Sequence, residues 1–101
     1  MKYVLSIFLS VCVSASYADT LTDVKTVKRV FSEGASTAGF FSAEGIPQCL
    51  YGIMYIDLSK DSGKAQFSML LSAKAANQKV VRMDYTLGVN GQCNMTGLHV
   101  E

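Results

Sequence analysis

Two cysteines and one histidine are the residues of this chain whose types best suit covalent or metal chemistry. Cys49 and Cys93 can form a disulfide, hold a metal ion or act as reactive thiols. Neither has a second cysteine three positions away, and the single His99 cannot complete a tetrahedral zinc site with them. The pattern favours a structural Cys49–Cys93 disulfide over a metal pair or a reactive thiol. We expect no metal site and no cofactor.

Catalytic patterns are weak. His99 could act as a general base, but no nucleophile with a supporting carboxylate stands out beside it in the sequence. The segment KDSGK, 60–64, resembles a phosphate-binding loop, but Leu58 and Ala65 stand where that motif needs Gly and Ser or Thr. The carboxylates are scattered, without paired-acid or calcium-loop spacing. The sequence therefore predicts a protein that is not an enzyme, with no catalytic residue.

Two tyrosines form the candidate binding face. Tyr51 and Tyr55 lie in the segment CLYGIMYIDL, 49–58, which we predict to be a strand with both rings on one face. Such rings could form an amphipathic platform for a sugar or a protein partner, with hydroxyls available for hydrogen bonds. The alternative is that both rings pack under the N-terminal segment with their hydroxyls at the rim.

The first residues have the pattern of a secretory signal peptide. A positive start at Lys2 is followed by an uncharged, mostly apolar run over 3–13, and small residues at Ser16 and Ala18 predict cleavage after Ala18. The run is about half of the ~20 residues that cross a bilayer, so no stable membrane anchor is expected. Cys12 lies in this run; Val11, where a lipoprotein signal needs a small residue, favours an ordinary apolar role. We expect residues 1–18 to be the leader and 19–101 a single small β-rich domain, exported to the periplasm or secreted.

The charge of the expected domain argues against some partners. Removing Lys2 from the nine basic residues leaves eight, which balance the eight acidic ones, so the formal charge falls from +1 to zero. A neutral surface of mixed signs does not favour a nucleic-acid or anionic-membrane partner held by long-range charge. A protein or glycan partner remains open.

The periodicity of the chain predicts five strands and one helix. We expect strands over 23–31 (where helical spacing is also present), 38–43, 49–58, 79–87 and 94–100. Ala65 to Ala76 has helical spacing, with Asp61 or Ser62 placed to cap its start and Asn77 its end. Because both faces of 49–58 are apolar and one helix cannot cover both, the fold class expected is α+β, mainly β: a small, partly closed five-stranded barrel with one helix.

The run GKAQFSMLLSAKAANQKVVRMDYTLGVNGQC, 63–93, resembles a pattern in small exported bacterial proteins of unknown function. It is similar, more distantly, to the B subunits of toxins of the subtilase-cytotoxin and pertussis-toxin kind. Those subunits are OB-fold barrels that bind host glycans. The resemblance implies an OB-like barrel and ring assembly through the helix flank. No sugar-contacting motif can be matched, so no binding residue is carried over.

These observations lead to two expected functions. The first is a secreted, non-catalytic binding module for a glycan or protein, ring-forming like the toxin B subunits and thus a homo-oligomer. The alternative is a monomeric periplasmic inhibitor or accessory protein of an envelope enzyme. A small hydrolase that uses His99 ranks last.

Overall fold

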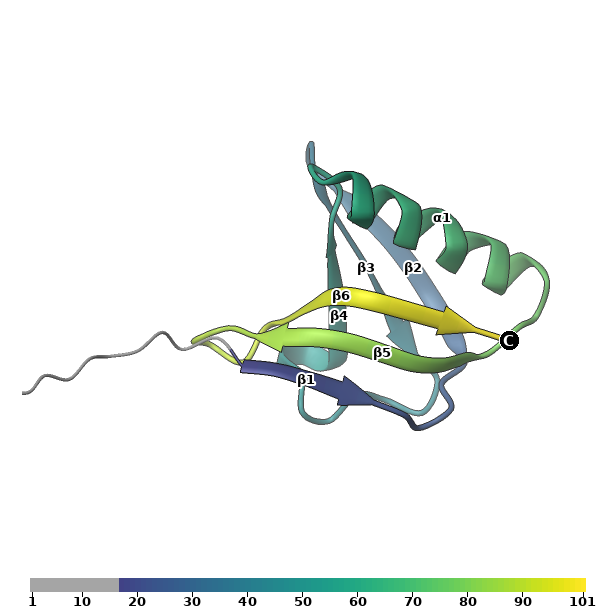
Figure 1. The fold of residues 1–101 in the computed structure, drawn as a ribbon, viewed down its shortest axis with the longest axis horizontal. Helices are drawn as coiled ribbons and strands as arrows, with labels where there is room; N and C mark the ends of the chain where they lie inside the picture. The colour runs from purple at the N-terminus through teal and green to yellow at the C-terminus, as the bar shows by residue number, and fades with distance from the viewer. Residues whose placement is uncertain (1–16) are drawn as a thin grey trace, which may run out of the picture.

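The computed structural model describes residues 17–101, and residues 1–16 lie outside the described part of the chain (Figure 1). The predicted leader falls almost wholly on those residues and stays a prediction. The described chain is mainly β with one α-helix, as the sequence predicts. Its elements are β1 (Tyr17–Leu21), β2 (Val27–Glu33), β3 (Thr37–Ser42), the short 3-10 helix η1 (Leu50–Gly52), β4 (Ile53–Asp57), α1 (Asp61–Ala75), β5 (Val80–Leu87) and β6 (Cys93–Val100).

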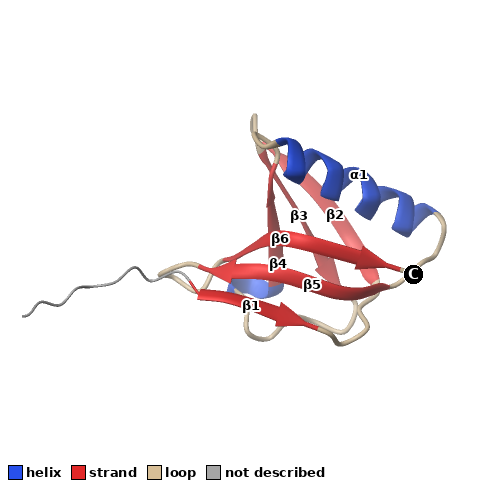
Figure 2. Cartoon of the chain, in the orientation of Figure 1, coloured by secondary structure: helices blue, strands red, loops and turns tan. Residues whose placement is uncertain are grey.

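The six strands form one sheet in the order β1-β5-β6-β4-β3-β2 (Figure 2). All neighbours are antiparallel except β4 and β6, which run parallel and pair only at Met54–Cys93 and Tyr55–Asn94. The sheet thus consists of two antiparallel units, β2-β3-β4 and β1-β5-β6, that meet at a short parallel junction. In Figure 1 the two units cross at a steep angle.

The two end strands of this order follow each other in the chain. The segment that links them, 22–26, carries an isolated bridge between Lys25 and Val80 of β5. One residue later, the Ala43 N–H donates to the Thr26 carbonyl at 2.9 Å. The buried Lys25 side chain donates from Nζ to the Gly45 carbonyl at 2.8 Å, which gives its ammonium group one hydrogen-bond acceptor. The linking segment 22–26 is therefore hydrogen-bonded to β5 in one unit and to Ala43, just after β3, in the other.

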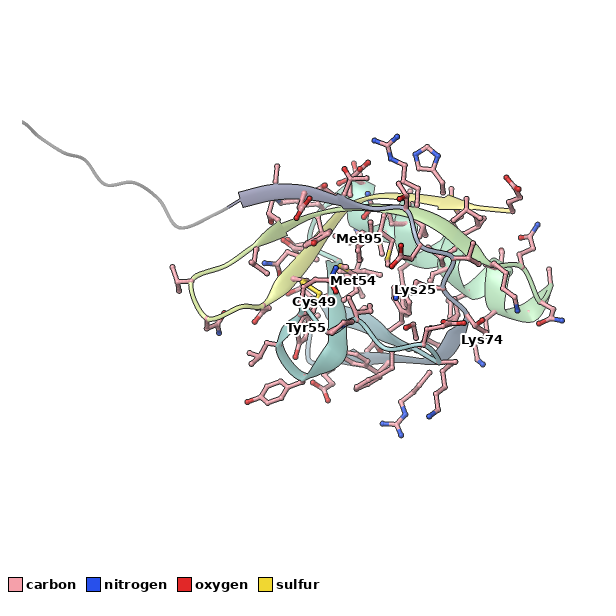
Figure 3. The ribbon with its side chains drawn as sticks, turned by 90° about the horizontal axis from the view of Figure 1, so that it is seen from below. Lys25, Cys49, Met54, Tyr55, Lys74 and Met95 are labelled. Carbon is pink, nitrogen blue, oxygen red and sulfur yellow. A yellow bond between two sulfur atoms is a disulfide. The ribbon has the colours of Figure 1, made fainter. Side chains whose placement is uncertain are left out.

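The core lies between the two units, where alternate strand residues point inward. In Figure 3 the labelled Lys25, Met54 and Met95 lie in this space. Helix α1 contacts β6, β2 and β4, and its Leu70 and Ala73 are fully buried. The largest fully buried side chains are Phe40, Ile46, Met54, Ile56, Leu70, Met83, Val80 and Cys93.

Helix α1 begins earlier than the sequence predicts. Its first residue is Asp61, and the cap residue is Lys60, whose side chain makes no capping bond, so the expectation of an Asp61 or Ser62 cap is wrong. The early start brings Gly63 against the carbonyl of Asp57, where a Cβ would not fit. Glycine at this position lets the helix pack directly on the end of β4.

The end of α1 agrees with the sequence. Asn77 has φ +60°, and its N–H donates to the Lys74 carbonyl at 3.3 Å. The Gln78 N–H reaches the Ala73 carbonyl at 2.8 Å. These two bonds form a Schellman motif, in which a left-handed residue ends the helix and satisfies its last carbonyls.

Three strands differ from the prediction. β1 is additional, since no strand is predicted before residue 23. β2 covers Val27–Glu33, although the predicted strand covers 23–31. β4 begins at Ile53, although the predicted strand begins at Cys49. Tyr51 and Gly52 both have positive φ, +60° and +69°, which interrupts extended structure and produces a tight turn before the strand.

Candidate functional site

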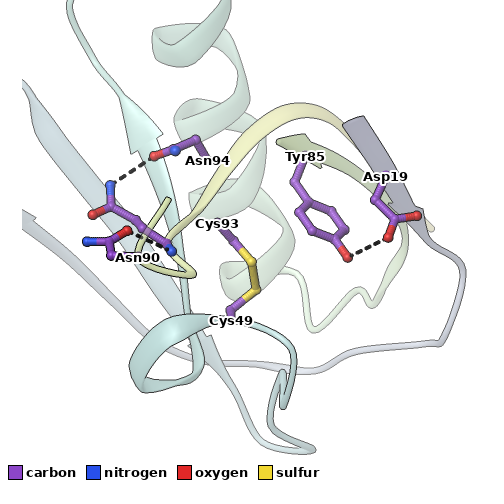
Figure 4. The surroundings of a disulfide bond; sticks show 7 residues. Asp19, Cys49, Tyr85, Asn90, Cys93 and Asn94 are labelled. Carbon is purple, nitrogen blue, oxygen red and sulfur yellow. Dashed lines mark hydrogen bonds between the residues drawn. A yellow bond between two sulfur atoms is a disulfide. The ribbon is translucent and has the colours of Figure 1, made fainter. Parts of the chain in front are cut away.

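The predicted disulfide is confirmed: Cys49 and Cys93 are bonded, with their Cα atoms 5.3 Å apart (Figure 4). Cys93 is fully buried and Cys49 nearly so. The bridge joins the residue before η1 to the first residue of β6. Because Cys93 pairs with Met54 of β4, the disulfide lies at the parallel junction between the two units.

A buried tyrosine, Tyr85, and an exposed aspartate, Asp19, lie near the disulfide. Figure 4 shows the Tyr85 hydroxyl donating to Asp19 Oδ2, at 3.3 Å. Burial raises the pKa of the Tyr85 phenol above its usual value, so the group stays protonated and remains a donor. The contact holds β1 against β5.

Tyr51 and Tyr55 do not share a strand face, so that part of the prediction is wrong. Tyr51 lies in η1, in the left-handed region, with 76% of its side chain exposed. A non-glycine residue in that region costs on the order of 1–2 kcal/mol. Tyr55 lies on β4 and is half-buried. The two rings therefore belong to different surfaces.

Tyr55 is part of an aromatic cluster on the outer face of β2, β3 and β4. The register places Phe31 opposite Gly39, and Gly39 opposite Tyr55. The Phe31 and Tyr55 rings meet edge to face with centroids 5.9 Å apart, and Phe31 also lies 5.9 Å from Phe41. The guanidinium of Arg29 lies 5.0 Å from the centre of the Phe41 ring, a cation–π contact.

Gly39 allows this cluster to form. A Cβ at this position would lie 2.8 Å from Cζ of Phe31 and 2.6 Å from the carbonyl of Met54. Without a side chain between them, Phe31 and Tyr55 touch across the middle strand. The cluster is thus a product of strand register and of one missing Cβ.

Polar side chains continue the row on the other side of Tyr55. Tyr55 is opposite Asn94 of β6, which is opposite Thr86 of β5. The Nε2 of Gln92 donates to Oδ1 of Asn94 at 3.0 Å, and this bond orients the Asn94 amide (Figure 4). One outer row therefore crosses five strands: Gly39 of β3 has no side chain, and the other four strands contribute two aromatic rings, an amide and a hydroxyl.

Three adjoining hollows follow this row, and together we call them the outer groove. The first, of about 200 Å³, contains Tyr55, Phe31 and Phe41. The second, of about 230 Å³, shares Tyr55 with it. The third, of about 340 Å³, shares Asp57 and Asn94 with the second. The full lining is Arg29, Phe31, Glu33, Ser36, Thr37, Phe41, Ile53, Tyr55, Ile56, Asp57, Lys60, Ser62, Gly63, Thr86, Gln92, Asn94, Met95 and Thr96.

Asp57 is the carboxylate common to two of these hollows. Its Oδ1 accepts from the Ser59 hydroxyl at 2.6 Å and from the Ser59 N–H at 2.9 Å. These two bonds, that of the hydroxyl first, lower the pKa of Asp57 below its usual value. Asp57 is therefore an ionised acceptor in a fixed orientation, and among residues 17–101 its Oδ2 accepts no hydrogen bond.

The outer groove is lined by both aromatic and polar side chains. It combines aromatic faces with acceptors and donors of the kind that contact hydroxyl groups. His99, the residue considered as a base, is exposed on β6 opposite Arg82 and outside the groove lining. Of these groove residues the sequence indicated Tyr55, and it gave no indication of Phe31, Phe41, Asn94 or Thr86. The alternation of inward and outward residues along each strand can be predicted from the sequence. Which outward residues lie beside one another depends on the register between strands that are distant in the chain.

Within residues 17–101, no helix is long and apolar enough to span a membrane. The same residues hold no cluster of three or more His, Cys, Asp or Glu side chains that could hold a metal ion. Comparison with known proteins finds no match to this chain among protein-family models, curated proteins or solved structures.

Proposed function

We propose that this chain is a non-catalytic, secreted binding module that holds a glycan in the outer groove. The observation that carries the proposal is the row of Phe31, Tyr55, Asn94 and Thr86, which come from four of the five strands that it crosses. A sugar has an apolar ring face edged by hydroxyl groups. The half-buried Tyr55 ring suits the ring face, and the neighbouring side-chain oxygens and nitrogens suit the hydroxyls.

The fixed orientation of the polar groups supports this function. Asn94 is held by Gln92, and Asp57 by Ser59, so each has lost much of its rotational freedom before a ligand arrives. A pre-ordered site loses less entropy on binding. An ionised Asp57 also accepts hydrogen bonds from two vicinal hydroxyls better than a neutral acid would.

The scaffold we propose is an OB-like, five-stranded barrel. β1 and β2 are then the two halves of one bent strand, the first paired with β5 and the second with β3. The Lys25–Val80 bridge and the bond from Ala43 to Thr26 support this assignment, because they keep the linking segment attached to both units. An OB-like barrel agrees with the resemblance to toxin B subunits.

Ring assembly is the further consequence of that resemblance. Met69 and Leu71 of α1 are each 42% exposed and lie on opposite flanks of the helix, where each leaves an apolar side chain that a neighbouring copy could cover. Light scattering of the domain from Asp19 onward should then give a multiple of the monomer mass. A monomer would favour the alternative function, an inhibitor or accessory protein of an envelope enzyme.

Binding to a glycan array, followed by titration calorimetry with the best ligand, tests the site. We expect Tyr55→Ala to lower the affinity at least tenfold, because the ring face is lost. Asn94→Ala should do the same through lost hydrogen bonds. The matched control is Tyr51→Asn, which removes a tyrosine outside the groove and should leave glycan affinity unchanged. No glycan bound, or equal affinity for the Tyr55 and Tyr51 variants, would refute the proposal.

A further inference from the structure

We propose that Tyr51 is the anchor of a second surface, which docks into an uncharged apolar pocket of a folded protein partner. The ring is 76% exposed, and its backbone has φ +60° and ψ 9°. Exposure of an aromatic ring to water is unfavourable, and so is a left-handed backbone at a residue other than glycine. Across residues 17–101, the Tyr51 ring takes part in no aromatic pair and its hydroxyl in no hydrogen bond.

The turn that carries Tyr51 is held rigidly from both sides. The Ile53 N–H donates to the Leu50 carbonyl, and the Gly52 N–H donates to the Cys49 carbonyl at 2.9 Å. The Leu50 N–H donates to the Gly91 carbonyl at 2.8 Å. The disulfide fixes the residue at the start of the turn. A turn whose backbone is already fixed gives up little conformational entropy when a partner buries it.

The surroundings of Tyr51 indicate the chemistry of the partner. The neighbouring β5–β6 turn presents Val89, which is 85% exposed. Neither 48–53 nor 88–93 contains a charged residue. A basic rim, which an anionic membrane or a nucleic acid would need, is thus missing from both segments. A tyrosine with an apolar neighbour and no charge suits a concave, uncharged protein pocket that admits a phenol ring.

Tyr51 and Val89 are not among the residues that line the outer groove, although Ile53 and Gln92 of the flanking segments are. A partner that contacts Tyr51 therefore uses a different side chain from those proposed to hold a glycan. Such a contact also suits the inhibitor or accessory role, in which one enzyme of the envelope is the partner.

The backbone provides a variant that separates binding from folding. Asn tolerates positive φ far better than Tyr does, so Tyr51→Asn should keep or raise the melting temperature. A melting temperature lowered by more than a few degrees would mean that the ring stabilises the fold itself. That result would overturn the proposal.

Site-specific photo-crosslinking finds the partner. p-Benzoylphenylalanine replaces Tyr51 in one variant and Val24, which is 56% exposed, in the control variant. In an extract of the producing cells, we expect one protein to crosslink at position 51 and not at position 24. That protein is then purified, and its affinity is measured for the wild type, Tyr51→Asn, Tyr51→Phe and Val24→Asn.

We expect Tyr51→Asn to weaken the affinity at least tenfold, while Tyr51→Phe and Val24→Asn change it less than threefold. A double Cys49→Ala/Cys93→Ala variant that remains folded should also bind more weakly, because its turn is no longer fixed. Besides a lowered melting temperature, four results would overturn the proposal: no adduct above the control, equal affinity for Tyr51→Asn and the wild type, a crosslink to a second copy of this chain, or binding to neutral lipid vesicles instead.

Discussion

The Phe31 and Tyr55 rings meet at an angle of 89° across Gly39, which lies between them on the middle strand of three. The residue with no side chain therefore determines where two of the largest side chains lie. Substituting Gly39 therefore tests how the side chains pack on the outer face of β2, β3 and β4.

Gly39→Ala should destabilise the protein by about 1–3 kcal/mol, as overpacking does. The new Cβ would lie 2.6 Å from the Met54 carbonyl and 2.8 Å from the Phe31 ring, so the ring must move. Urea unfolding measures the loss. Gly88→Ala is the control, because its Cβ meets nothing closer than 3.6 Å. Equal free energies of unfolding for the two variants would show that Phe31 does not lie on Gly39.

Gly63→Ala should also destabilise, although alanine in place of glycine inside a helix normally stabilises by about 1 kcal/mol. The added Cβ would collide with the Asp57 carbonyl at the end of β4. We expect a net loss of about 1–3 kcal/mol, measured by thermal unfolding followed by circular dichroism. A stabilised variant would mean that α1 begins after Gly63, nearer the start that the sequence predicts.

Removal of the disulfide should lower the free energy of unfolding by about 4 kcal/mol, the chain-entropy value for a loop of this length. The two cysteines are 44 residues apart. The comparison is between wild type and Cys49→Ala/Cys93→Ala, each unfolded in urea with and without a reductant. Reductant should weaken the wild type and leave the variant unchanged. If reductant leaves the free energy of unfolding of the wild type unchanged, the disulfide is absent in solution.

Ser59→Ala should raise the pKa of Asp57, because the Ser59 hydroxyl is the largest cause that lowers it. A carboxyl whose folded pKa lies below its unfolded value of about 3.9 stabilises the fold above that pH. The contribution is lost as the pH falls through the folded pKa. In Ser59→Ala the folded pKa of Asp57 lies closer to its unfolded value, so the variant loses less stability than the wild type as the pH falls.

An NMR titration of the Asp57 carboxyl carbon checks this directly. Ser62→Ala serves as the control, since Ser62 makes no hydrogen bond to Asp57 within the described residues. The same Asp57 pKa in wild type and Ser59→Ala would contradict the assignment of the cause.

Elements whose signals are local could be predicted well from the sequence. Helical spacing located most of α1, and Asn77 marked its end, because left-handed closure depends on one residue type. The strand predicted over 79–87 is β5, Val80–Leu87. The pairing of Cys49 with Cys93 could be predicted because they are the two cysteines of the domain expected over 19–101, and an exported domain was expected to form a disulfide.

Features that depend on tertiary structure could not be predicted in the same way. The apolar run 49–58 reads as one strand, although Gly52 was a local sign of the turn that separates Tyr51 from Tyr55. Nothing local indicates that Phe31 and Asn94 flank Tyr55, because register is decided by packing between distant segments. The early start of α1 depends likewise on the fit of Gly63 against β4.

The two-pair junction between β4 and β6 has a consequence for the order of folding. The β2-β3-β4 unit and the β5-β6 hairpin can form through contacts that are short in sequence, whereas pairing β1 with β5 and joining the two units both require closing a long loop. Cys49 and Cys93 belong to different units and approach only when these join. Thiol oxidation should therefore be a late event during maturation, trapping a topology that is already assembled.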